Sequence, residues 1–318
     1  MDAAGLKRSW SLVAQYGDQV PLFFYSSLFL TYPQVREMFP VAMASQRDKL
    51  VTALGQIVSN VDDLEALMPM LQQLGRDHRK FAVVREHYPA VGATLLSTLA
   101  HFSGPEWTEE LARDWAAAYG LVAKVMIDAA EAAAAEMPPW WECEVVACER
   151  RTLDVAVITV KPNYQLTYRA GQSLAVETPF RPRLWRYYSP ATLPAADGSF
   201  ELHVRIVGGG PVSTALVQNT QPGDVLRTGA PVGHQLTVDP ADQRDLLLLA
   251  GGTGLAPMKA ILQQVRIEGG TRRVQLFWGT RQRRELYDLP ALRALADGDG
   301  RIGVVPCVSH EPAFDGDV

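Results

Sequence analysis

The sequence has few cysteines and no long apolar run. Its three cysteines, Cys143, Cys148 and Cys307, lack the paired spacing of a zinc site, and so sparse a set indicates reduced thiols in a cytoplasmic protein. No apolar run reaches the roughly 18 residues of a membrane-spanning helix. The N-terminus also lacks the basic-then-apolar layout of a signal peptide. We therefore expect a cytoplasmic protein without stable membrane insertion.

The chain also has no excess of positive charge. The 318 residues carry 30 Lys and Arg against 35 Asp and Glu, which gives a formal net charge of −5. This modest acidic balance disfavours nucleic acid as a general partner. The hydrophobic fraction of 47% is ordinary for a globular protein. The length predicts two or three domains, each able to bury its own core.

Helical patterns dominate residues 1–136. Mostly apolar stripes recur at helical spacing: Leu22, Tyr25 and Phe29; Gln46, Leu50, Ala53 and Ile57; and Leu67, Leu71, Leu74 and His78. A helix is expected from Pro89 to about Phe102 and a long Ala-rich one from about Trp107 to Glu136. No convincing strand interrupts them, so the segment is predicted to be an all-α domain.

The pattern changes at Met137, where Pro138 and Pro139 stop the helix. Residues 137–239 alternate apolar and polar positions with frequent Gly and Pro, which predicts a small antiparallel β-barrel. From residue 240 to 318, apolar strands at 245–250, 273–278 and 302–308 alternate with helical segments. That order predicts βαβ units and a parallel sheet, so the third domain is expected to be a doubly wound α/β domain in part.

His78 is the candidate metal ligand of the helical domain. The domain holds three histidines, and His87 and His101 fall near helix junctions, whereas His78 caps a clean apolar stripe. A lone histidine on an apolar face is often a core residue whose hydrogen bonds are satisfied. The alternative is a haem ligand, which must be a neutral imidazole held by a hydrogen bond to its other nitrogen.

Tyr25 and Gln46 are polar residues on apolar helical faces, so burial would require hydrogen-bond partners. Either they reach solvent at the edge of a stripe, or they lie together over a bound dioxygen and donate to its negatively polarised oxygen. The residues alone favour neither interpretation.

The predicted barrel contains more specific indications of cofactor binding. Arg186, Tyr188 and Ser189 supply a cation for a diphosphate, a ring for a flavin face and a hydroxyl for a ring nitrogen. The run 208–214, GGGPVST, then opens a short helix whose backbone N–H groups can cradle a diphosphate. The turn 251–254, GGTG, follows a buried strand and opens another helix, which is the context of a phosphate-binding turn.

These residues together resemble the flavohaemoglobins, most closely the actinobacterial type, over essentially the whole chain. In the helical half the resemblance rests on the Phe24-Tyr25 pair, Phe39, the Gln46-Arg47 pair, His78 and the run 87–92, HYPAVG. It implies a globin domain with haem b, His78 as the iron ligand, Tyr25 and Gln46 as the distal pair, Phe39 packed on the porphyrin, and Tyr88 in the hydrogen-bonding set around His78.

In the second half, the resemblance implies an FAD-binding barrel and an NAD(P)H-binding domain of the ferredoxin-reductase type. Three sets of residues match its motifs: Arg186, Tyr188 and Ser189 for FAD; Gly210, Val212, Ser213 and Thr214 for the diphosphate loop; and Gly251, Gly252, Thr253, Gly254 and Pro257 for the NAD(P)H turn. The sequence does not decide between NADH and NADPH.

The chain departs from the family's pattern at two places. The family's proximal glutamate is replaced by Ala130, and Glu131 follows about 100° further around the helix, so it should point elsewhere. The nucleotide domain has only three expected strands, and we expect its C-terminal part to be missing. Its first strand should then expose an apolar edge.

The resemblance implies a monomeric nitric oxide dioxygenase in which NAD(P)H reduces FAD, FAD reduces haem, and NO and O2 become nitrate. Two alternatives remain open: an O2-binding or redox-sensing globin with a vestigial or truncated reductase, and a general flavin or haem reductase.

Overall fold

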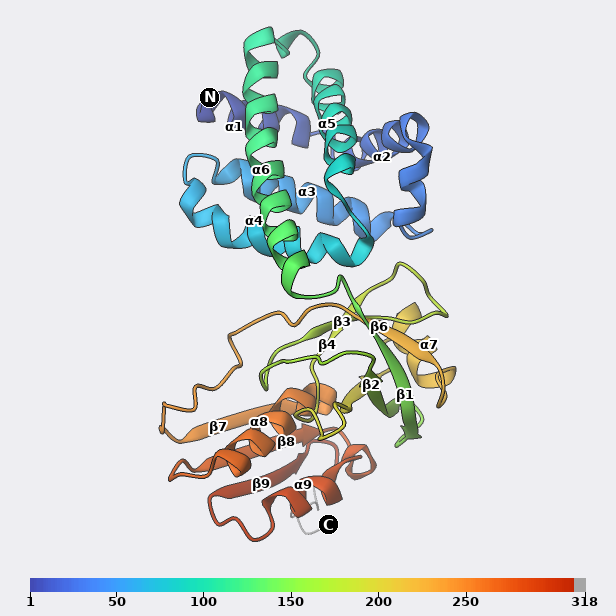
Figure 1. Cartoon of the computed structure of the whole chain (residues 1–318), viewed down its shortest axis with the longest axis vertical. Coiled ribbons are helices and arrows are strands. Elements are labelled where there is room, and N and C mark those ends of the chain that lie inside the picture. The colour runs from blue at the N-terminus through green and yellow to red at the C-terminus, as the bar shows by residue number, and fades with distance from the viewer. Residues whose placement is uncertain (312–318) are drawn as a thin grey trace. The chain divides into compact units, whose positions relative to one another are not determined.

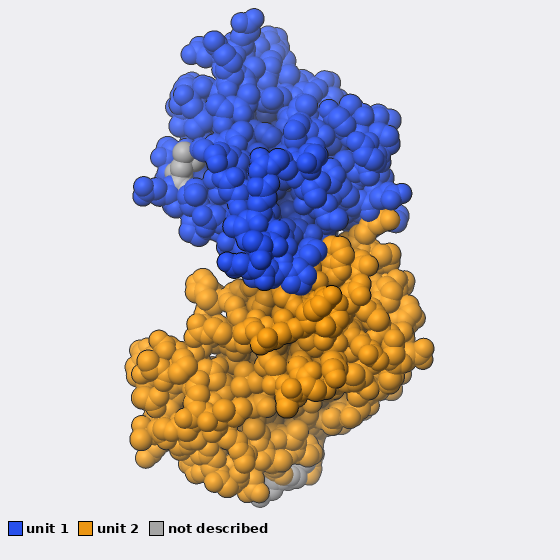
Figure 2. All heavy atoms as spheres, in the orientation of Figure 1, with its two compact units in different colours: residues 1–139 blue, residues 140–318 orange. Residues whose placement is uncertain are grey.

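The computed structural model describes residues 1–311, apart from the side chain of residue 64. The expected third domain, 240–318, therefore has its residues 312–318 outside the described part. The chain divides into two compact units, Met1–Pro139 and Trp140–Val318 (Figure 2). Within the described residues, no helix is both long and apolar enough to cross a membrane.

The first unit is helical, as expected. Its α-helices are α1 (Ala3–Ala14), α2 (Gln19–Thr31), α3 (Ala44–Ser59), α4 (Leu64–His78), α5 (Tyr88–Ser103) and α6 (Glu109–Glu136). Short 3₁₀ turns connect them, including η1 (Pro33–Met38), η2 (Arg79–Phe81), η3 (Arg85–His87) and η4 (Gly104–Glu106).

Two helix starts in this unit are capped by side chains. The Asp63 carboxylate accepts a hydrogen bond from the Ala66 amide at the start of α4, and the Thr108 hydroxyl accepts one from the Leu111 amide at the start of α6.

Helices α4 and α6 cross closely (Figure 1). Gly75 makes that crossing possible, because a Cβ there would lie 2.2 Å from the carbonyl oxygen of Met126. The crossing sets the position of the C-terminal end of α4, where His78 lies.

The second unit begins with a six-stranded antiparallel sheet. Its strands are β1 (Trp141–Arg150), β2 (Val155–Pro162), β3 (Leu174–Glu177), β4 (Arg186–Tyr188), β5 (Phe200–Arg205) and β6 (Val225–Thr228), in the order β4-β3-β6-β1-β2-β5. The two outer strands approach each other, because Pro190, just after β4, bridges to Leu202 in β5. The sheet is therefore nearly closed, which confirms the expected barrel. Helix α7 (Pro211–Gln218) follows β5.

The rest of the unit is an α/β domain. Three parallel strands, β7 (Leu246–Gly251), β8 (Val274–Thr280) and β9 (Ile302–Val308), form a sheet in the order β7-β8-β9. Helices α8 (Leu255–Glu268) and α9 (Leu289–Ala296) connect them and share one core with the sheet residues Leu248, Leu276 and Trp278 (Figure 1).

The expected apolar edge is present, since β7 is an outer strand of the described sheet. Apolar exposure extends further than predicted, because alternate residues point away from the helices. Leu247 and Leu249 are 65% and 67% exposed, and Phe277 and Val305 are partly exposed on the neighbouring strands.

Candidate functional site

His78, the last residue of α4, has the orientation that a haem ligand requires. Its Nδ1 donates to the Leu74 carbonyl oxygen at 2.7 Å, since a carbonyl can only accept. The proton is thereby held on Nδ1, and Nε2 keeps its lone pair. Burial lowers the pKa of His78, which favours the neutral imidazole. A neutral ring with a free Nε2 can bind iron.

The other two histidines of the helical unit are engaged differently. His87 Nδ1 accepts a hydrogen bond from the Val84 amide at 3.1 Å and closes the turn before α5. The His101 ring stacks on Phe23 with a centroid separation of 4.3 Å. Their roles in a turn and a ring stack favour His78 as the candidate ligand.

Tyr25 and Gln46 are brought together from α2 and α3. The Gln46 side-chain amide donates to the Tyr25 hydroxyl at 3.3 Å. Tyr25 is buried, and burial raises its pKa to about 12, so its hydroxyl keeps its proton at neutral pH. Phe39 joins the pair, with its ring centroid 5.5 Å from that of Tyr25. The structure thus gathers three of the predicted residues into one cluster with two neutral hydrogen-bond donors.

Tyr88, the first residue of α5, is held through its backbone. The Tyr119 hydroxyl donates to the Tyr88 carbonyl oxygen at 2.6 Å, and the absence of a side chain at Gly92 leaves room for the Tyr119 ring. Within the described residues, the Tyr88 hydroxyl is buried without a hydrogen-bond partner. A buried orphan hydroxyl of this kind is suited to a polar group that a bound cofactor brings.

The expected outward direction of Glu131 is confirmed. Glu131 turns outward and forms an ion pair with Arg85, with Oε2 2.7 Å from the guanidinium nitrogen. His78 therefore has a backbone carbonyl, rather than a carboxylate, as its hydrogen-bond partner.

These observations fit haem. The fold needs to supply only one iron ligand for that group, and His78 offers a free Nε2, while Tyr25 and Gln46 form a separate donor pair. Within residues 1–311, no group of three or more His, Cys, Asp or Glu side chains is placed to hold a bare metal ion.

The flavin candidates lie on and just after β4. This strand pairs with β3, so that Arg186 lies opposite Val176 and Tyr188 opposite Leu174. Burial raises the pKa of Tyr188 to about 12, which keeps the phenol neutral. Within the described residues, the exposed Arg186 guanidinium makes no ion pair and donates only to the Trp185 carbonyl. An uncompensated arginine beside a half-buried ring fits a flavin with its diphosphate.

The Ser189 hydroxyl lies 2.9 Å from that of Ser173, which joins the end of β4 to the start of β3. This hydrogen bond fixes the Ser189 side chain next to Tyr188.

The second flavin element is the loop before α7. Gly210 caps the helix, and Gly209 has a φ of +75°, which a residue with a side chain rarely adopts. The Ser213 hydroxyl donates to the Gly210 carbonyl and accepts from the Val207 amide, so it closes the loop itself. The Val212 side chain is buried in the core, which holds the start of α7 in place. The Thr214 N–H donates to the Gly210 carbonyl oxygen at 3.1 Å, and Pro211 has no N–H. The backbone N–H groups of Val212 and Ser213 are therefore the ones at this helix start that can bind a diphosphate.

The nucleotide candidates lie where β7 ends. Gly251 ends the strand, residues Gly252–Gly254 form a 3₁₀ turn, and α8 follows with Pro257 in its first turn. Gly252 has a φ of +52°, and its carbonyl accepts from the Trp278 indole N–H at 2.9 Å. A glycine turn between a parallel strand and a helix is the usual position for a dinucleotide in an open α/β sheet.

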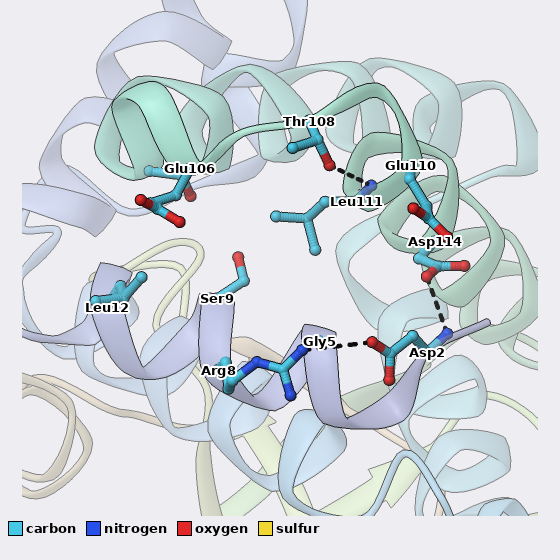
Figure 3. Close-up of a pocket in the computed structure, with 11 residues that line it drawn as sticks. Asp2, Gly5, Arg8, Ser9, Leu12, Glu106, Thr108, Glu110, Leu111 and Asp114 are labelled. Carbon is cyan, nitrogen blue, oxygen red and sulfur yellow. Dashed lines mark hydrogen bonds and ion pairs between the residues drawn. The ribbon is translucent and has the colours of Figure 1, made fainter.

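A separate cavity of about 270 Å³ lies between α1 and the start of α6 (Figure 3). Its lining includes Asp2, Arg8, Ser9, Glu110 and Asp114, and none of the predicted site residues.

Sequence reasoning missed a buried polar cluster in the second unit. The cluster consists of Glu201, His203, Lys259, Tyr287 and Asp288. Its only local signal is the alternation of Glu201, His203 and Arg205 along β5, which places all three on one face of the strand.

A helical domain with one histidine whose Nε2 is available, joined to a flavin-type barrel and a dinucleotide-type α/β domain, defines an oxidoreductase that uses haem and flavin. Comparisons with protein families agree. The globin family matches residues 22–126, the oxidoreductase FAD-binding domain matches 142–236, and the oxidoreductase NAD-binding domain matches 248–317.

Curated relatives cover all three domains. The flavohemoprotein of Deinococcus radiodurans is 30% identical over 276 residues, which cover 81% of this chain and 68% of the relative. That of Bordetella bronchiseptica is 28% identical over 300 residues, covering 87% and 73%. The chain belongs to the flavohemoprotein family, and it is an NAD(P)H-dependent oxidoreductase with haem and FAD as cofactors.

Solved structures agree on the fold. The flavohemoglobin from Malassezia yamatoensis, determined with bound FAD and heme, superposes with a TM-score of 0.76 at 18% identity, covering 97% of this chain and 84% of that one. The FAD/NAD-binding domain of a nitric oxide dioxygenase from Vibrio cholerae gives a TM-score of 0.50 at 21% identity, covering 55% and 76%.

Proposed function

We propose that the chain is a nitric oxide dioxygenase that converts NO and O2 to nitrate at the expense of NAD(P)H. The observation that carries the proposal is the pairing of buried Tyr25 with half-buried Gln46, whose side-chain amide lies 3.3 Å from the Tyr25 hydroxyl. A neutral phenol and an amide offer preorganised hydrogen bonds to an oxygen on which negative charge develops. The name of the Vibrio cholerae structural neighbour supports the same assignment.

In this proposal His78 holds the haem iron through Nε2, and the Leu74 carbonyl keeps its proton on Nδ1. Phe39, whose ring contacts that of Tyr25, would pack on the porphyrin, and the orphan hydroxyl of Tyr88 would join the hydrogen-bonding set around His78. When bound, the flavin supplies the conversion of a hydride into single electrons for the haem, where O2 and NO react.

The second unit binds and orients the flavin and the nucleotide. Arg186 would neutralise the FAD diphosphate, and Tyr188 and Ser189 would contact the flavin ring. The remaining proposed contacts are Gly210, Val212, Ser213 and Thr214 for the diphosphate, and Gly251, Gly252, Thr253, Gly254 and Pro257 for NADH or NADPH.

We further propose that the domain boundaries lie at 136/137 and 239/240, so that the nucleotide domain comprises residues 240–318. We also propose that the protein is a cytoplasmic monomer. The three cysteines, all unpaired, support a reducing compartment. Light scattering during size-exclusion chromatography tests the oligomeric state.

The function is tested with an NO electrode on protein loaded with haem and FAD, in aerated buffer with NADH. Tyr25→Phe should slow NO consumption by roughly tenfold or more, because it removes one donor. Tyr164→Phe is the matched control, since Tyr164 is 67% exposed and should leave the rate unchanged. NADH oxidation without NO consumption in the parent protein would contradict the proposal and favour a general reductase.

A second candidate is O2 binding or redox sensing by the globin domain. The outward turn of Glu131 favours it, because a carbonyl makes His78 less electron-rich than a carboxylate would. Sustained NADH-dependent NO consumption would exclude this candidate.

A further inference from the structure

The outer face of β5 carries three ionisable residues. Glu201, His203 and Arg205 alternate with Phe200, Leu202 and Val204, which are buried in the barrel. An outward face of a barrel strand normally meets water. Here the His203 side chain is fully buried, because α8 and the segment before α9 cover it. This face therefore forms the seam between the barrel and the nucleotide domain.

His203 is the centre of a cluster that spans the seam. Its Nδ1 lies 3.0 Å from the Tyr287 hydroxyl. Its Nε2 faces two carboxylates, 3.5 Å from Glu201 Oε2 and 3.9 Å from Asp288 Oδ2. The Lys259 ammonium lies 2.8 Å from each of those carboxylates. Barrel residues thus contact α8 and the start of α9 through the His203–Tyr287 contact and the ion pairs of Lys259. Within the described residues, His203 Nε2 and both Asp288 carboxylate oxygens are buried without a hydrogen-bond partner, so these atoms belong to the cluster through charge and proximity.

Such a network is a costly way to hold two domains together. Buried charges must be desolvated, and a well-packed apolar seam is often at least as stable. Polar partners demand particular distances, whereas an apolar seam tolerates sliding. The cluster is therefore better suited to fixing the relative position of the two domains than to adding stability.

Two contacts connect the cluster to the nucleotide turn. The Tyr287 ring lies edge-on to Trp278, with centroids 5.4 Å apart, and the Trp278 indole donates to the Gly252 carbonyl. Tyr287, Gly252 and Thr253 also line one small cavity of about 10 Å³, together with Arg205 from β5. The turn Gly252–Gly254, which would bind the nucleotide, is therefore connected to the cluster at the seam.

We propose that His203, Tyr287 and Asp288 are positioning residues that lock the nucleotide turn Gly252–Gly254 against the FAD barrel. Hydride transfer depends steeply on the separation of donor and acceptor, and a displacement of about 1 Å can cost roughly a hundredfold in rate. The inference rests on the NAD(P)H–FAD half of the function and is independent of the NO chemistry.

The test uses the full chain loaded with FAD and haem, with the variants His203→Gln, Tyr287→Phe and Asp288→Asn. His234→Gln and Tyr164→Phe are matched controls, because both of these residues are exposed. Rapid mixing with NADH under anaerobic conditions gives the limiting rate of flavin reduction and the apparent dissociation constant. We expect the limiting rate to fall about tenfold or more in the cluster variants, with the dissociation constant changed less than the rate.

Amide hydrogen exchange of the same proteins without nucleotide gives a second readout. Peptides covering 246–256 and 274–291 should exchange faster in the cluster variants than in the controls, while peptides of the helical unit keep their rates. If the parent flavin is not reduced by NADH, the proposed electron supply fails, and the exchange result alone decides the positioning role.

Tyr287→Phe is the decisive variant, because it keeps the ring against Trp278 and removes only the hydroxyl. A folded, FAD-loaded Tyr287→Phe protein with parental flavin reduction and parental exchange would overturn the proposal. A change confined to the dissociation constant would also overturn it, since that result indicates direct contact with the nucleotide.

Discussion

Gly75→Ala should destabilise the helical unit, although alanine is the better helix former. A Cβ at Gly75 would lie 2.2 Å from the Met126 carbonyl oxygen, and ordinary contact begins near 3.4 Å. The obstacle is backbone, so α4 and α6 must separate by about 1.2 Å. Overpacking costs about 1–3 kcal/mol, and the gain in helix propensity is about 1 kcal/mol. Because neither backbone can turn aside, the overpacking cost should lie at the upper end of that range, about 3 kcal/mol, so we expect a net loss of about 2 kcal/mol.

Gly120→Ala provides the control within α6. No atom lies within 4 Å of a Cβ at that position, so the change should stabilise the helix by up to about 1 kcal/mol. The difference of about 3 kcal/mol corresponds to a gap of about 10 °C in the midpoint of the helical transition. Calorimetry and circular dichroism of the full chain measure that gap.

Gly75→Ala should also retain haem less well than Gly120→Ala, because His78 lies one turn further along the displaced helix. A helical transition of Gly75→Ala at or above that of Gly120→Ala would refute the argument.

Three further predictions follow from single residues. His78→Ala should lose the haem absorption band while His87→Ala retains it, and unchanged haem content in His78→Ala would refute ligation. His203 and Lys259 hold the pKa of Glu201 at about 2, below its ordinary 4.5. This contribution to stability is present above pH 4.5 and is lost as pH falls toward 2; it is on the order of 1 kcal/mol after allowance for solvent screening. Glu201→Gln should therefore flatten the fall in the melting temperature of the second unit between pH 5 and 3, and parallel curves would contradict the assignment. Arg85→Ala should leave the midpoint of denaturant unfolding nearly unchanged, because its ion pair with Glu131 is exposed; a clear fall in that midpoint would contradict this assignment.

Local patterns predicted much of the fold. The helices of the first unit and the strands of the barrel follow from apolar spacing that each segment contains within itself. The glycine turns at 208–210 and 251–254 were predictable for the same reason, since a turn before a helix depends on neighbours in the sequence. The outward direction of Glu131 followed from helix geometry alone, and its ion pair with Arg85 confirms it.

Contacts between distant segments could not be predicted in this way. His203 and Asp288 meet only because β5 and the start of α9 lie on the same seam, and no periodicity within either segment indicates it. The orphan hydroxyl of Tyr88 depends on how α5 packs around it. The exposed face with Leu247 and Leu249 depends on which side of the sheet the helices cover, whereas the sequence indicated only an apolar strand at an edge.

The most direct test of the account is an anaerobic titration of the haem- and FAD-loaded chain with NADH, followed by visible absorption. We predict that the flavin band bleaches and that the haem band shifts from its ferric to its ferrous position in the same titration. A haem that dithionite reduces but NADH does not would contradict the account, because the globin domain would then be intact without its electron supply.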